Sequence, residues 1–121
     1  MRGAQWVLAP LLAAGLAVGL AAAGAEVAPK EKVVQVAAER YKFTPEVIRL
    51  RVGEPVVLEL TSLDRRHGFR APDLKIDETI EPGKVTRVRI VPEKAGTYEF
   101  HCSVFCGSGH EEMTGQIVVS P

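Results

Sequence analysis

The chain has 121 residues, of which 15 are Lys or Arg and 15 are Asp or Glu, so its formal net charge is zero. This balance excludes a nucleic-acid binder that is held by bulk positive charge. The length allows one small domain, and two cysteines are too few for the disulfide framework of a small secreted scaffold.

The first 25 residues differ from the rest of the chain. After Arg2, residues 6–25 carry no charged side chain, and the segment ends in Ala-Gly-Ala at 23–25. These features are typical of a secretory signal peptide, although about 20 apolar residues also suffice for a single membrane anchor. In both cases Arg2 stays inside. We therefore predict that the domain works in the periplasm or on the outer face of the cytoplasmic membrane.

The remainder of the chain has the hydrophobic pattern of a β domain. Residues 26–32 are polar, contain a proline and are predicted to form a linker. Apolar and polar residues then alternate with a period of two, which favours strands over helices. The alternating stretches are residues 48–52, 56–60, 87–90, 97–102 and 113–119. With Gly and Pro turns between them, they predict an all-β domain at 33–121, an antiparallel sandwich or small barrel of Greek-key type.

The alternation also predicts where the side chains of the last two strands point. Phe100 and Cys102 share one face of their strand, so we expect Cys102 to point inward and His101 outward. In the closing strand, Met113 has the same parity as Ile117, which assigns it to the core. Both strands therefore aim side chains into the same end of the domain.

Between these strands runs a loop that is rich in soft metal donors. Two thiols, an imidazole and a thioether come from Cys102, Cys106, His110 and Met113. This soft set favours copper over magnesium, calcium or manganese, and Met is a poor ligand for zinc. Gly107 and Gly109 let the backbone turn tightly. His67 lies in a polar turn 35 residues before Cys102, and a sandwich would bring it to the same end.

Each of these residues also has a purely structural interpretation. Two cysteines in an oxidising compartment more often form a disulfide, and a spacing of four residues permits one. A single Met of core parity usually packs, and a single His in a turn usually lies at the surface. The joint pattern favours the metal site, because independent accidents would not readily place a His and a Met so close after two Cys.

At these residues the chain resembles the CuA domain of cytochrome c oxidase subunit II, a cupredoxin. The family's Cys-x3-Cys-x3-His-x2-Met loop matches Cys102, Cys106, His110 and Met113, and its upstream histidine matches His67. The similarity runs from about residue 41 to residue 119. It implies two copper ions bridged by the two cysteine sulfurs, each with one histidine. Met113 and the backbone carbonyl of Val104 would complete the set.

The resemblance also implies a function in electron transfer, without bond-making chemistry of the chain's own. A cytochrome c or another small redox protein would donate single electrons, which would pass to the catalytic subunit of an oxidase. Val104 stands where the family often has Glu, so the expected donor at this position is only the peptide oxygen. Residues 26–121 contain no Trp, the usual site of electron input, and the available aromatic substitutes are Tyr41, Phe43, Phe69 and Phe105.

Three other functions remain open at this level. A mononuclear cupredoxin would use one Cys, two His and Met113, and the second Cys at this spacing counts against it. A periplasmic copper delivery or storage protein would use the same donors. An immunoglobulin-like binding module with a local disulfide is the third, although a disulfide within one loop would not tie two sheets together.

Overall fold

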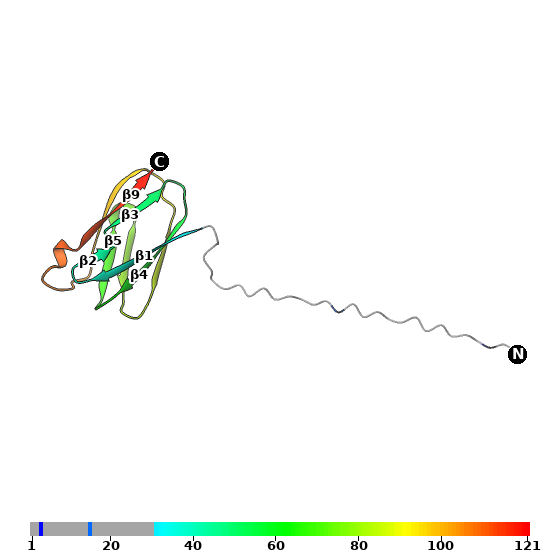
Figure 1. Ribbon diagram of the computed structural model, residues 1–121, viewed down its shortest axis with the longest axis horizontal. Coiled ribbons are helices and arrows are strands. Elements are labelled where there is room, and N and C mark those ends of the chain that lie inside the picture. The colour runs from blue at the N-terminus through cyan, green and yellow to red at the C-terminus, as the bar shows by residue number, and fades with distance from the viewer. Residues whose placement is uncertain (1–2, 4–14, 16–30) are drawn as a thin grey trace.

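Nine strands in two facing sheets make up the computed structural model, which describes Gly3, Gly15 and residues 31–121. The strands are β1 (Lys32–Glu39), β2 (Lys42–Thr44), β3 (Val47–Arg51), β4 (Val56–Ser62), β5 (His67–Ala71), β6 (Ile76–Ile80), β7 (Thr86–Ile90), β8 (Gly96–His101) and β9 (Thr114–Ser120). One sheet has the order β2-β1-β4-β7 and the other β3-β9-β8-β5-β6. Figure 1 shows the domain that they form. The predicted all-β sandwich is confirmed.

The strands with the clearest alternation are those that the sequence predicts. In β3, Ile48 and Leu50 are buried between exposed neighbours, and in β4 Val56, Leu58 and Leu60 are buried. The other three predicted stretches correspond to β7, β8 and β9, with ends shifted by at most one residue. Helical structure among the described residues is limited to two short 3-10 turns, η1 (Pro72–Leu74) and η2 (His110–Glu112).

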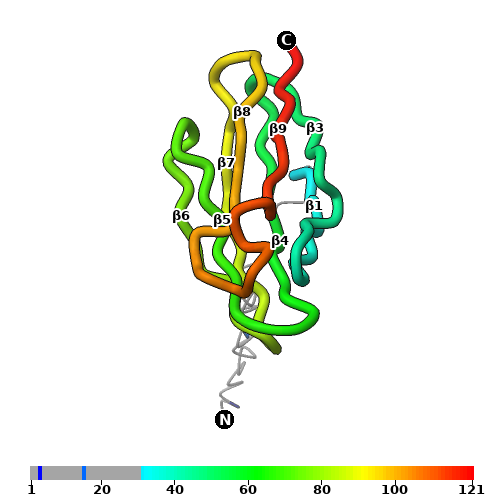
Figure 2. Tube along the Cα trace, turned by 90° about the vertical axis from the view of Figure 1, so that its left-hand side faces the viewer, coloured from blue at the N-terminus to red at the C-terminus, as the bar shows by residue number. Residues whose placement is uncertain are grey.

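The expectation of purely antiparallel sheets is wrong at two strand pairs. β1 runs parallel to β4, and β3 runs parallel to β9, as Figure 2 shows for β3 and β9 side by side. Hydrophobic alternation reports which face a residue occupies, but it carries no information about the direction of the neighbouring strand. The chain also changes sheets between β2 and β3, a crossing that the local pattern does not reveal.

Three buried phenylalanines form the centre of the core. The rings of Phe69 and Phe100 stack with centroids 4.5 Å apart, and Phe43 packs edge-on against them at 5.8 and 5.1 Å. Each such pair stabilises a fold by about 0.5–1.5 kcal/mol beyond the burial of its surface. Phe69 follows His67 by two residues and Phe100 precedes Cys102 by two, so this cluster supports both strands that lead to the candidate site.

The predictions for the N-terminal part fall mostly outside the described residues. This holds for the signal peptide or anchor at 1–25 and for the linker at 26–32, apart from its last two residues, of which Lys32 begins β1. Within the part of the chain that the structure describes, no helix has the length and apolar character needed to cross a bilayer.

Candidate metal centre

The pairing of β5 with β8 brings His67 beside Cys102. The two strands are antiparallel with Arg70 opposite His101, so the start of β5 lies next to the residues that follow β8. The backbone N–H of Gly68 donates to Cys102 Sγ at 3.4 Å. The structure corrects one expectation here, because His67 is the first residue of β5 and fully buried, and does not lie in a polar turn.

The hydrogen-bond ladder of β8 and β9 closes the base of the loop. The Cys102 N–H donates to the Met113 carbonyl at 3.0 Å, one step beyond the last paired residues of the two strands. Cys102 and Met113 are both buried, whereas His101 is half-buried and joins none of the contacts among the candidate donors. The predicted parity of all three residues is therefore confirmed.

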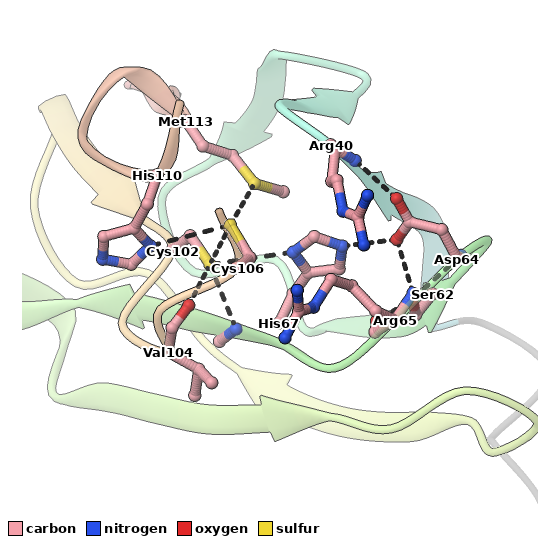
Figure 3. A network of polar contacts seen from close by, with 11 residues as sticks. Arg40, Ser62, Asp64, Arg65, His67, Cys102, Val104, Cys106, His110 and Met113 are labelled. Atoms are coloured by element: carbon pink, nitrogen blue, oxygen red, sulfur yellow. Dashed lines mark hydrogen bonds and ion pairs between the residues drawn. The ribbon is translucent and has the colours of Figure 1, made fainter. Parts of the chain in front are cut away.

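The five side chains that the sequence singles out meet at this end of the sandwich (Figure 3). Cys102 Sγ lies 3.7 Å from Cys106 Sγ and 3.8 Å from His67 Nδ1. Cys106 Sγ lies 3.6 Å from His110 Nδ1 and 3.8 Å from Met113 Sδ. The two sulfurs thus occupy the centre, with one imidazole on each.

The carbonyl of Val104 completes this cluster. Cys102 Sγ donates to the Val104 oxygen at 3.1 Å, and the Val104 side chain points away from the sulfurs in Figure 3. The peptide oxygen therefore faces the candidate donors regardless of the residue type at this position.

The spacing of the donors fits bound metal. At zinc sites, metal bonds are about 2.3 Å to sulfur and about 2.0 Å to imidazole nitrogen. At a tetrahedral angle, bonds of these lengths place a sulfur and a nitrogen about 3.5 Å apart, and two sulfurs about 3.8 Å apart. The separations of 3.6 to 3.8 Å between sulfur and nitrogen, and of 3.7 Å between the sulfurs, agree with these values. The donor atoms of His67, Cys102 and Cys106 all lie within 4.8 Å of one another. Thiols, imidazoles and a thioether together are a set that suits copper.

The local disulfide that the spacing of the cysteines permits is not formed. Both cysteines are free and buried, and their sulfurs lie 3.7 Å apart, well beyond the roughly 2.05 Å of a disulfide bond. Burial, together with the hydrogen bond and charge of Cys102, raises the pKa of the Cys106 thiol to about 11. Without metal this thiol holds its proton at neutral pH, so metal binding must release it.

Asp64, which sequence reasoning missed, orients the ring of His67. Its Oδ1 lies 2.7 Å from His67 Nε2, on the side of the ring opposite Cys102 (Figure 3). Partial burial opposes the charge of Asp64, but hydrogen bonds from the Arg40 amide, the His67 ring and the Arg65 amide lower its pKa to about 2. The ionised carboxylate accepts a hydrogen bond from Nε2–H, which leaves the Nδ1 lone pair facing the sulfurs. The only signal in the sequence is an acidic residue three positions before the histidine.

Of the four aromatic residues that could replace the missing Trp, two lie at the surface. Phe43 and Phe69 are buried in the core, whereas Tyr41 is 36% exposed and Phe105 is 71% exposed. Phe105 directly precedes Cys106, and its ring centroid is 5.6 Å from that of His110. On the outer side, a hollow of about 340 Å³ is lined by residues that include Glu99, Cys102 and His110. The cluster thus has two halves, one around His67, which is fully buried, and one around His110, which is only half-buried. The His110 half is the accessible one.

Comparison with known proteins identifies the family of this chain. The model of the cupredoxin-like domain family matches residues 10–119, so the chain belongs to that family. Within it, the chain is homologous to cytochrome c oxidase subunit 2. It is 35% identical over 91 residues to such a subunit from Thermus thermophilus, covering 75% of this chain and 67% of the relative. It covers only 54% of a second such subunit from the same species, so the chain is shorter than the proteins that it matches.

Chains in solved structures of oxidases have a similar fold. The structure of a heme-copper terminal oxidase dimer contains a chain that is 29% identical to this one, with a TM-score of 0.68 and coverage of 89% of this chain and 84% of that chain. The periplasmic domain of subunit II of the cytochrome oxidase of Bradyrhizobium japonicum has the same fold, with a TM-score of 0.70, coverage of 78% and 88%, and 16% identity.

Proposed function

We propose that this domain binds two copper ions in a CuA-type centre and transfers single electrons into a terminal oxidase. The proposed ligands are the side chains of His67, Cys102, Cys106, His110 and Met113 and the backbone carbonyl of Val104. When bound, the copper pair accepts and releases one electron at a time. The homology to cytochrome c oxidase subunit 2 supports this function.

The main support for the proposal is that each cysteine sulfur has its own histidine ring beside it. Two sulfurs lie 3.7 Å apart, and each has its own imidazole, at 3.8 Å for Cys102 and 3.6 Å for Cys106. A mononuclear centre needs one thiolate with two imidazoles around it. Here the imidazoles belong to different sulfurs, which favours two metal ions over one.

The protein contributes a dry and stiff environment. His67, Cys102, Cys106 and Met113 are all buried, so the sheets exclude water from most of the cluster. The Gly68 N–H donates to the Cys102 sulfur and the Asp64 carboxylate fixes the His67 ring, so two groups are oriented before any metal binds. A preformed site of this kind limits the movement that accompanies a change of charge.

We further propose that the domain acts on the periplasmic side and receives electrons from a cytochrome c or a similar small redox protein. Relatives of this fold include a periplasmic domain of oxidase subunit II, which supports the location. The accessible half of the cluster, with Phe105 beside His110, is the surface on which the donor would dock. The acceptor would be the catalytic subunit of the oxidase.

Metal analysis joined to electron paramagnetic resonance tests this proposal on the full chain. We expect two copper ions per chain and the hyperfine pattern of one electron shared between two copper nuclei. One copper per chain with a localised electron would instead establish the mononuclear cupredoxin. Rapid loss of copper to a weak chelator, with no reversible oxidation and reduction, would point to a delivery protein.

A further inference from the structure

The ring of Tyr41 lies against the loop that carries Cys106 and His110. Tyr41 comes from the turn between β1 and β2, far from this loop in the sequence. A Cβ atom placed on Gly107 would overlap the Tyr41 hydroxyl oxygen, and one placed on Gly109 would lie 2.5 Å from ring carbons Cγ and Cδ2. Real Cβ atoms stay at least 3.0 Å from such neighbours, so the ring and the loop backbone are packed as closely as glycine permits.

The Tyr41 hydroxyl lies beside the same loop, since it is the atom nearest to a Cβ placed on Gly107. The polar groups of Ser108 and Gly109 lower the pKa of Tyr41 below its usual value, against a smaller opposing effect of burial. The ring and the hydroxyl of Tyr41 therefore both lie against the loop.

The two glycines are required for different reasons. Gly107 has φ of +141°, a conformation that favours glycine whatever surrounds it. Gly109 has φ of −94° and ψ of 12°, which other residues also adopt. The Tyr41 ring, which leaves no space for a side chain, is thus what restricts position 109 to glycine. The sequence pattern suggests backbone turning at both positions, whereas the structure shows that both also leave room for the Tyr41 side chain.

We propose that Tyr41 is a positioning residue for the metal centre, whose ring packs over residues 107–109 and thereby fixes the spacing of Cys106 and His110. The inference rests on the proposed function, in which both residues are copper ligands. A segment with two glycines has much conformational entropy to lose, and a stacked ring reduces the number of backbone states that the metal must select. Within the segment itself, only short-range hydrogen bonds such as His110 N–H to Gly107 carbonyl, 3.2 Å, restrain the backbone.

Copper release from two variants of Tyr41 tests the proposal on the full, copper-loaded chain. Tyr41→Ala should release copper to a Cu(I) chelator at least about tenfold faster, in line with the lower end of the affinity losses that follow removal of outer contacts at other metal sites. It should also broaden the hyperfine lines. Tyr41→Phe keeps the ring and should stay within about threefold of the unmodified chain. Tyr98→Ala is the matched control, because Tyr98 packs on the core and donates to the Lys94 carbonyl, away from the loop. It should lower the melting temperature without changing copper release.

A compensating pair of substitutions gives a second, independent test. Gly109→Ala alone should lower both the melting temperature of the copper-free chain and the yield of the copper spectrum, because its methyl group meets the ring. Tyr41→Ala combined with Gly109→Ala should recover the melting temperature that Tyr41→Ala has alone. Tolerance of Gly109→Ala in the unmodified chain, or copper release from Tyr41→Ala at the unmodified rate, would overturn the positioning role. If the unmodified chain binds no copper, the proposed function fails, and the positioning role fails with it.

Discussion

The two imidazoles of the candidate centre are held in different ways. His67 belongs to a strand inside a sheet, is fully buried and has its far nitrogen 2.7 Å from the Asp64 carboxylate. His110 begins a three-residue 3-10 turn and is half-buried, and its side chain contacts Cys106 and the Phe105 ring. The sheet thus builds one half of the cluster, and the loop builds the other.

In the proposed centre, this difference would give the two halves different tasks. A ligand fixed by sheet pairing and a carboxylate is in place before metal arrives, so it provides stiffness. A ligand on an accessible loop provides a short path to the surface, at the cost of needing contacts such as that of Tyr41 to hold it. We expect substitutions in the His67 half to weaken binding, and substitutions near the accessible surface to change the rates of exchange with partners.

Loss of either cysteine should have the largest effect, because the two sulfurs lie at the centre of the cluster, between the two imidazoles. Cys102→Ser and Cys106→Ser should each abolish the dinuclear spectrum, as measured by electron paramagnetic resonance and metal content. His101→Ala is the neighbouring control, since His101 is half-buried, makes no hydrogen bond to the candidate donors and should leave the spectrum nearly intact. Loss of copper from His101→Ala would show that the outer face takes part in the site.

Reactivity of Cys106 in the copper-free chain tests the burial of the loop half. Burial raises its pKa from 9.0 to about 11, so at pH 8 we expect about 100-fold less thiolate than for an unshifted thiol. Because the shift is upward, reactivity should rise steadily as the pH increases towards 11. Iodoacetamide labelling, followed by mass spectrometry of the peptide that contains Cys106, measures this. The same labelling in urea is the control, and equal rates in both conditions would contradict the burial.

Removal of the Asp64 charge should weaken the sheet-built half specifically. Asp64→Asn should lower copper affinity by about 10- to 100-fold, because the carboxylate no longer fixes the tautomer and orientation of His67. Competition with a chelator of known affinity measures the change. Glu111→Gln removes a carboxylate directly after His110 and should have little effect, so equal losses in both variants would contradict the difference between the halves.

The smallest expected effect concerns the charges around His67. Arg65 and Arg66 directly precede it in the sequence. The Arg66 side chain is largely exposed, and its Nε lies 3.0 Å from Oε1 of Glu81. If they face the donor, changing both to Glu should speed electron transfer from a basic cytochrome several-fold at low salt, since rim charges act mainly on association. Above about 0.15 M ionic strength, screening over roughly 8 Å should remove most of the gain. Equal rates at low salt would place the arginines off the docking surface.

The sequence predicts the parts of this protein that depend on local pattern. Alternation identifies β3, β4, β7, β8 and β9 and the inward parity of Cys102 and Met113, because burial of one face imposes that pattern directly. It does not single out β1, β2, β5 or β6, and at β5 the polar residues before His67 resemble a turn. It also misses the parallel pairs, since strand direction leaves no local trace. The donors themselves are visible as a motif. Asp64 and Tyr41 are missed because their roles arise from contacts that only the folded chain creates.

The parallel pairing of β3 with β9 also determines when the centre can form. Val47 pairs with Gln116, so the five-stranded sheet joins segments that lie at opposite ends of the domain's sequence. Contacts between such distant segments close late, because the entropy of the intervening chain must be lost first. During synthesis, His67 also emerges before Cys102 and Cys106, so its sulfur neighbours are missing until the loop after β8 is complete. For the proposed centre, we therefore expect metal insertion to follow completion of the domain.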